Sequence, residues 1–182
     1  YSPIVFMAAA MALSIMGDGA LYTLLPSHYV HIDLTPFQVG ILLSINRWIR
    51  LGSNHLAERC YRRLPVSPLL VIAFFIGSLV TAGYGCFKVF LILLLARILW
   101  GISLSFTRQA GLMTVVSTLS RIHLGKGMGI HRSIALVGFF FGSLIGGIVY
   151  DAYGFLWVFI SFSLLSLGSI PLSLSSQRGL QA

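Results

Sequence analysis

Several ionisable residues lie inside long apolar runs of this sequence, where a charge is costly. They are Asp18, Arg47, Arg50, Arg97 and Arg108. A charged side chain at the centre of a bilayer costs about 3 kcal/mol on insertion scales, so such residues usually face a water-filled cavity or an oppositely charged partner. Carboxyl groups can carry protons, and guanidinium groups can bind anions. These positions are therefore candidates for a substrate or proton pathway.

The arginines recur at helical spacing on two of the runs. Arg47, Arg50 and Asn54 stand at positions i, i+3 and i+7, which places them on one face of a helix. A second such face, on a later run, consists of Arg97, Gly101, Leu104 and Arg108. We predict that both polar stripes line one central cavity.

The charges in these runs do not balance. If Asp18 pairs with one arginine, two of Arg47, Arg50 and Arg97 remain unmatched. An anionic substrate would neutralise them, and protonation of Asp18 would free one arginine. The alternatives are that water, or acidic residues on a further part of the protein, satisfy the arginines. Arg50 and Arg108 could also extend along the helix toward the membrane surface.

The segments that carry these residues have the length and composition of membrane-spanning helices. The 182 residues are 57% hydrophobic and 9% charged, which excludes an ordinary soluble fold, because soluble domains carry about 25% charged residues. About 20 consecutive apolar residues cross a bilayer as a helix. Runs of this kind cover residues 4–29, 36–56, 68–87, 89–112, 127–150 and 155–174.

The beginnings of the second and third expected helices are marked in the sequence. Thr35 is followed by Pro36 and Gln38, which predicts an N-cap, a proline at the first helical position and a capping box. Ser67 and Pro68 repeat the first part of this pattern. We therefore expect these helices to begin at the two prolines.

The positive charge of the chain indicates orientation and not a nucleic-acid partner. The net charge is +8, but the cations are spread thinly between apolar runs and form no basic face. Lys and Arg are retained on the cytoplasmic side of membrane proteins. One set of alternate connections holds Arg59, Arg62, Arg63, Arg121, Lys126, Arg132 and Arg178, and the other holds Lys88. Both termini are thus predicted to be cytoplasmic, with residues 1–174 forming the membrane bundle and 175–182 beginning a cytoplasmic linker or tail.

Glycines at a spacing of four indicate close helix packing. The fifth run carries Gly138, Gly142, Gly146 and Gly147. Small residues at this spacing let two helix backbones approach, so packing is favoured over a gating contact. The histidines lack metal-ligand spacing, so we expect no metal and no other cofactor.

Three motifs in the chain resemble signatures of the major facilitator superfamily. The run GSNHLAERCYRRL resembles the family's loop signature G-x-L-A-D-R-x-G-R-K, ARILWG resembles R-x-x-Q-G, and GFFFGSLIGG resembles G-x-x-x-G-P-x-x-G-G. Asn54, Glu58, Trp100 and Ser143 stand where the family usually has Gly, Asp, Gln and Pro. The motifs occur in the family's order and on the expected helices.

The resemblance implies an all-α membrane protein and the N-terminal six-helix half of the family's fold. This half is built from two inverted three-helix repeats, and two halves together move a substrate by alternating access. The resemblance also implies a cytoplasmic gate that latches the two halves. Its motif here comprises Asn54, Glu58, Arg59, Arg62 and Arg63. Gly101 joins the glycines of the fifth run as a helix-packing residue.

Together the residues and the resemblance predict secondary active transport of a small organic solute, coupled to protons, with efflux and anion transport both open. Asp18 would be the coupling acid or the cavity counter-charge, and Arg47 and Arg97 the substrate or relay cations. The alternative is a non-transporting or dimerising six-helix membrane protein. An intramembrane serine protease is disfavoured, because Ser143 lacks the required glycine spacing and no histidine follows His131.

The expected partners follow from this function. They are the lipid bilayer, a small-molecule substrate, protons, and either a C-terminal six-helix half or a second copy of the chain. The expected location is the plasma membrane or the bacterial inner membrane.

Overall fold

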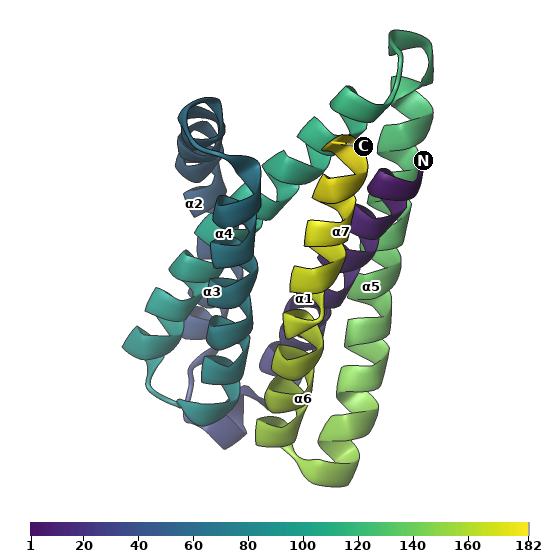
Figure 1. Cartoon of the computed structure of the whole chain (residues 1–182). Helices are drawn as coiled ribbons and strands as arrows, with labels where there is room; N and C mark the ends of the chain where they lie inside the picture. Colours follow the sequence, from purple (N-terminus) through teal and green to yellow (C-terminus); the bar gives the residue numbers. More distant parts are fainter. Residues whose placement is uncertain (182) are drawn as a thin grey trace.

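The computed structural model describes residues 1–181, and in that range the chain forms helices joined by short connections, with no strand (Figure 1). The predicted all-α fold is confirmed for these residues. The elements are α1 (Ser2–His28), η1 (Tyr29–Ile32), α2 (Pro36–Arg63), α3 (Val66–Cys86), α4 (Phe90–Thr118), η2 (Arg121–His123), α5 (Leu124–Tyr153), α6 (Phe155–Leu167) and α7 (Ser169–Gln181).

The long helices run up and down along one direction, so their connections gather at two ends. Both termini lie at the same end as the α2–α3 and α4–α5 connections, and we call this the terminal end (Figure 1). The opposite end holds η1 and the α3–α4 and α5–α6 connections (Figure 1). The connections rich in Lys and Arg therefore share one end with the termini. The assignment of that end to the cytoplasm stays a prediction.

Five segments are long and apolar enough to cross a membrane: α1 with η1, α3, α4, η2 with α5, and α6 with α7. The second predicted span, α2, is not among them, because Arg47, Arg50 and the polar stretch 54–63 lower its hydropathy. With 28 residues, α2 is about 42 Å long and lies along α4. Its crossing of the membrane therefore stays a prediction based on its length and place in the bundle.

The helices of the first half of the chain pack mainly on those of the second half. α1 lies against α5 and also contacts α6 and α7. α2 packs along α4, and α3 lies between α4 and α6. The largest apolar core fills the bundle toward the end opposite the termini, and Tyr84, Trp100 and Phe159 are among its fully buried members.

The predicted start of α2 is confirmed, and that of α3 is not. The backbone N–H of Gln38 donates to Thr35 Oγ1 at 3.3 Å, and the N–H of Thr35 donates to Gln38 Oε1 at 2.9 Å, which is a complete capping box. α3 begins two residues earlier than expected, with Pro65 as its N-cap. The N–H groups of the first helical turn have no acceptor within the helix, so proline is tolerated at any position there. Pro68 therefore lies within the first turn and does not mark the start of α3.

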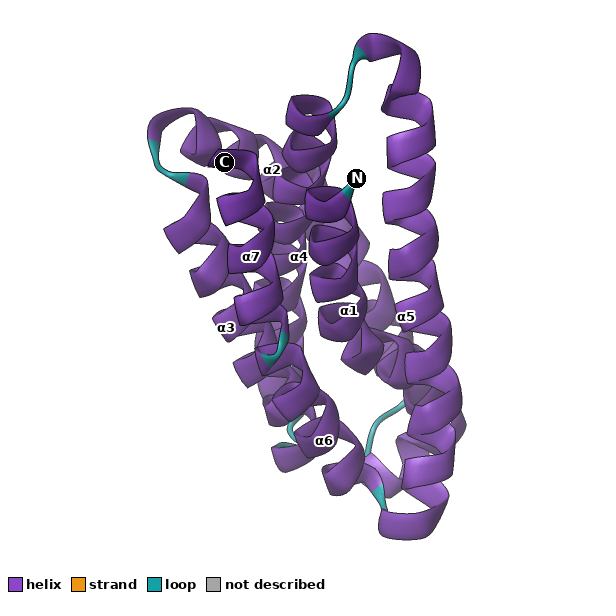
Figure 2. Cartoon of the chain, turned by 45° about the vertical axis from the view of Figure 1, so that its right-hand side comes forward, coloured by secondary structure: helices purple, strands orange, loops and turns teal. Residues whose placement is uncertain are grey.

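The last predicted span, residues 155–174, is interrupted and extends further than expected. α6 ends at a turn at Gly168, and α7 begins at Ser169, a step visible partway along this segment in Figure 2. Pro171 has no N–H to donate to the carbonyl of Leu167, so the helix cannot continue through this point unbroken. Residues 175–181, expected to begin a linker or tail, continue α7, and Ala182 lies outside the described residues.

Candidate functional site

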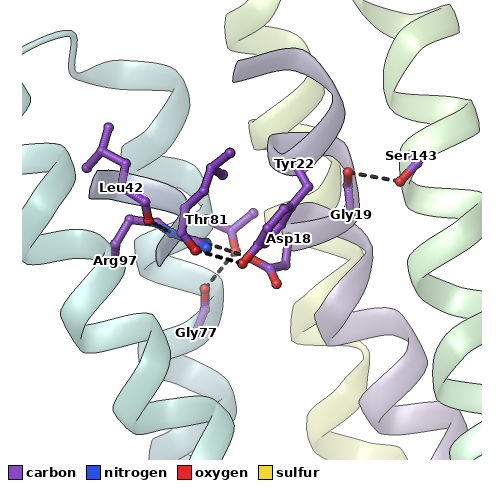
Figure 3. A network of polar contacts seen from close by, with 9 residues as sticks. Asp18, Gly19, Tyr22, Leu42, Gly77, Thr81, Arg97 and Ser143 are labelled. Carbon is purple, nitrogen blue, oxygen red and sulfur yellow. Dashed lines mark hydrogen bonds and ion pairs between the residues drawn. The ribbon is translucent and has the colours of Figure 1, made fainter. Parts of the chain in front are cut away.

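A seam of glycines brings α1 and α5 into backbone contact and so fixes the position of Asp18. A Cβ atom at Gly138 or Gly142 would collide with the backbone of Ala12 or Met16. On the α1 side of this seam, Gly19 faces the backbone of α5 and accepts a hydrogen bond from Ser143 Oγ at 2.9 Å (Figure 3).

Gly146 also belongs to the seam, since a Cβ there would lie 2.6 Å from Ala20 Cβ. Gly147 does not, because the space around its Cβ position is open. Gly101 packs elsewhere: its Cβ position lies 3.1 Å from Asn46 Oδ1 on α2. Of the four glycines predicted on α5, three therefore face α1, as their spacing of four requires.

Asp18 and Arg97 form an ion pair inside the bundle, as Figure 3 shows. Arg97 Nη1 lies 2.5 Å from Asp18 Oδ1, and the two side chains are only 1% and 5% exposed. Arg97 Nε also donates to the carbonyl of Leu42 on α2 at 3.0 Å. One guanidinium group on α4 therefore ties α1 and α2 to its own helix.

Two tyrosines flank the ion pair. The guanidinium carbon of Arg97 lies 5.3 Å from the ring centre of Tyr22 on α1 and 5.9 Å from that of Tyr84 on α3. A cation over an aromatic face is attracted to the ring, and more so without water. Tyr22 Oη donates to the carbonyl of Leu43 at 3.0 Å, which holds its ring in place. Arg97 Nη2 and Tyr84 Oη are buried without a hydrogen-bond partner within residues 1–181.

A separate cavity of about 270 Å³ lies between α1, α2, α4 and α5, in the half of the bundle nearer the terminal end. Its polar wall consists of the cations Arg50, Arg108 and Arg132 and the imidazole of His131. Its apolar wall includes Met11, Ile15, Leu104, Leu112, Ala135 and Phe139. The cavity thus combines cations from three helices with aliphatic and aromatic surface.

The structure brings together only part of the two predicted polar stripes. Arg50 and Arg108 line the cavity, whereas Arg97 is sealed inside the ion pair. Arg47 and Asn54 are exposed and do not line the cavity. This differs from the prediction of one shared cavity, because Arg97 and Arg108 are about 16 Å apart along α4, and only Arg97 is buried and paired with Asp18 of α1.

The sequence prediction missed the contribution of α5 to this cavity. From the sequence, we expect no metal at His131, and Arg132 indicates only orientation. Both line the cavity, at i+3 and i+4 from Met128. The same spacing continues on α5 through Ala135, Leu136 and Phe139. This periodicity was the available signal for a cavity-facing stripe.

The predicted cytoplasmic gate motif is helical and not a loop. Asn54, Glu58, Arg59, Arg62 and Arg63 all lie within α2, and only two residues, 64 and 65, separate α2 from α3. Residues 54–64 contain no Gly or Pro, so the helix continues through the motif. Arg62 Nη2 pairs with Glu58 Oε1 at 2.6 Å one turn apart, an exposed contact of the kind that supports a helix.

The acidic residues of the chain leave the cavity without a counter-charge. There are four of them in the sequence. Asp18 pairs with Arg97, and Glu58 pairs with Arg62. Asp33 and Asp151 lie near the end opposite the termini, and neither lines the cavity. The described residues hold no cluster of three or more His, Cys, Asp or Glu side chains suited to a metal ion.

Comparison with known proteins gives one finding on the family. A sequence model described as the Major Facilitator Superfamily matches residues 7–177. No curated protein matches the chain. The matched range extends from the first turns of α1 to the last turns of α7, so it contains the ion pair, the glycine seam and the cavity.

Proposed function

Since the chain belongs to the major facilitator superfamily, a family of membrane transporters, we propose that it moves a small organic solute by secondary active transport. Family membership and the apolar helices make the chain part of an integral, multi-pass membrane protein. The observation that carries the proposal is the cationic cavity between α1, α2, α4 and α5, beside a buried ion pair. Ionisable groups at such depth usually belong to a substrate or ion pathway.

Alternating access fits the distribution of packing along the bundle. The cavity lies toward the terminal end, while the largest apolar core closes the opposite end. In the proposed cycle, the solute would reach the cavity from the terminal end. In the proposed cycle, this bundle rocks against a second six-helix unit, which is either a C-terminal half of the same protein or a second copy. With cytoplasmic termini, the described conformation opens to the cytoplasm.

Proton coupling is proposed at Asp18. Protonation of its carboxyl group would remove the counter-charge of Arg97 and leave a buried guanidinium group unpaired, which is costly. A proton on Asp18 would therefore alter the packing of α1 on α4. Arg97 is the relay cation in this scheme.

The test is proton movement driven by a solute. The full protein is reconstituted into liposomes that contain a pH-sensitive dye, and a panel of small organic acids, bases and neutral solutes is added outside. We expect at least one solute to change the internal pH, and Asp18→Asn to abolish that change. Asp151→Asn, at an exposed acid near the end of α5, is the matched control and should behave as the original protein.

Two results would contradict the proposal. If no solute crosses the membrane with or without a pH gradient, the alternative of a non-transporting or dimerising membrane protein is favoured. If Asp18→Asn leaves the solute-driven pH change intact, then transport stands and Asp18 is not the coupling acid.

A further inference from the structure

We propose that the cavity binds an amphipathic organic anion, with its charged group at Arg50, Arg108 and Arg132 and its apolar body against α1 and α5. This inference rests on the proposed function, because it names the substrate class of that transporter. Three observations carry it: the uncompensated charge of the cavity, the unpartnered donors in its wall and the apolar character of the remaining surface.

The first observation is the concentration of like charge. Arg50 on α2, Arg108 on α4 and Arg132 on α5 line one cavity of about 270 Å³. None of the four acidic residues lines this cavity. Arg50 is half-buried, and Arg108 and Arg132 are exposed on the cavity wall. Because like charges repel, binding of an anion would stabilise this arrangement.

The second observation concerns hydrogen bonding. Arg50 Nε and His131 Nε2 are both buried, and neither has a hydrogen-bond partner within the described part of the chain. Both side chains line the cavity. Buried donors are almost always paired in proteins, so the unpaired Arg50 N–H points to an acceptor from outside the described residues. The oxygen atoms of a carboxylate, phosphate or sulfonate group are acceptors of this kind.

The third observation excludes a small inorganic anion as the best occupant. Most of the remaining wall is aliphatic or aromatic and includes Met11, Ile15, Leu104 and Phe139. An inorganic anion would lose its hydration against such a surface without a matching gain. The ring centre of Phe139 lies 5.9 Å from that of Tyr22, which adds aromatic surface beside this wall. An organic body attached to the anionic group would fill the apolar part.

The experiment measures binding to the full protein in detergent, separately from transport. The probe is 1-naphthalenesulfonate, which stays charged at all working pH values and does not cross membranes as a neutral acid. Its neutral sulfonamide and a quaternary ammonium derivative of the same ring system test the charge, and inorganic sulfate tests the apolar body. We expect the sulfonate to bind at least about tenfold more tightly than the other three.

Variants locate the site. Arg50→Gln and Arg108→Gln should each weaken sulfonate binding about tenfold to a hundredfold, since each removes a charge-assisted contact. Arg50→Lys keeps the charge and should restore part of the affinity, which separates binding from a folding defect. Arg121→Gln, at an exposed arginine in η2 outside the cavity, removes the same charge and should leave the affinity unchanged.

Tighter binding of the ammonium derivative, or unchanged sulfonate binding in both cavity variants, would overturn the inference. If inorganic sulfate binds as tightly as the sulfonate, the proposed contact between an apolar body and the cavity wall is contradicted. Failure of this proposal is distinguishable from failure of the proposed function. Proton-coupled movement of other solutes without sulfonate binding would support the transport proposal and contradict the proposed substrate class. Sulfonate binding with the expected variant effects, but no transport of any solute, supports the site and removes the transport proposal.

Discussion

Replacing Arg97 alone should strongly destabilise the folded protein. Arg97→Gln leaves the carboxylate of Asp18, whose side chain is only 5% exposed, without a cation. Removing one member of a buried ion pair costs about 3–5 kcal/mol, because the remaining charge is neither hydrated nor neutralised. Asp18→Asn should cost a similar amount, since it leaves the guanidinium group of Arg97 in the same state.

The double variant Asp18→Asn with Arg97→Gln should be more stable than the sum of these effects predicts. It places two neutral amides where the charges were, so only the lost hydrogen bond to Leu42 and the lost contacts with Tyr22 and Tyr84 remain. Those losses amount to about 2–4 kcal/mol. We therefore expect the two single effects to exceed the double effect by at least about 2 kcal/mol.

The assay is unfolding of the purified protein in micelles, by heat or by a denaturing detergent, followed through tryptophan fluorescence. Trp100 is 1% exposed and lies one turn from Arg97 on α4, so it reports on this region. The exposed pair of Glu58 and Arg62 provides the control, because Arg62→Gln should cost no more than about 1 kcal/mol. Additive effects of the two single variants would refute the argument, as would single effects as small as that of the control.

Two further predictions use matched positions in the chain. Gly142→Ala should lower stability by about 1–3 kcal/mol, because its Cβ would collide with the backbone of Met16, whereas Gly147→Ala, which faces open space, should be neutral or slightly stabilising in the same unfolding assay. In intact cells, a membrane-impermeant maleimide should label a variant that keeps Cys86 and not one that keeps Cys60, because these cysteines lie near opposite ends of the bundle. The reverse labelling would contradict cytoplasmic termini.

The parts of the fold that depend on local sequence could be predicted from it. Thr35 and Gln38 form the expected capping box because all of its atoms lie within four residues. The spacing of Gly138, Gly142 and Gly146 indicated a packing face for the same reason. Element ends were less predictable. α2 continues to Arg63, because no Pro or Gly interrupts residues 54–63, and α6 ends before Gly168, because the N–H that would continue the helix is missing at Pro171.

The candidate site was less predictable, because it depends on which helices are neighbours. The spacing of Arg97 and Arg108 correctly placed them on one face of α4, but it could not say that only Arg97 is buried and paired with Asp18 of α1. The charge sum indicated that a pair between Asp18 and one arginine would leave two arginines unmatched. It could not choose among three candidates, since that choice requires the packing of α1 against α4. The stripe of α5 that lines the cavity was not predicted, because the glycines of this helix indicated only helix packing.

The pairing of early helices with late ones has a consequence for biosynthesis. α1 makes few contacts with α2 and α3, and its main neighbour is α5, which begins nearly a hundred residues after α1 ends. As the chain leaves the ribosome, α1 therefore enters the bilayer before its main partners are synthesised. Asp18 stays unpaired until α4 inserts, and the face of α1 that contacts the glycines stays uncovered until α5 inserts. The first three helices would not form a stable intermediate of their own. Assembly of this bundle is a late event that depends on the whole described chain.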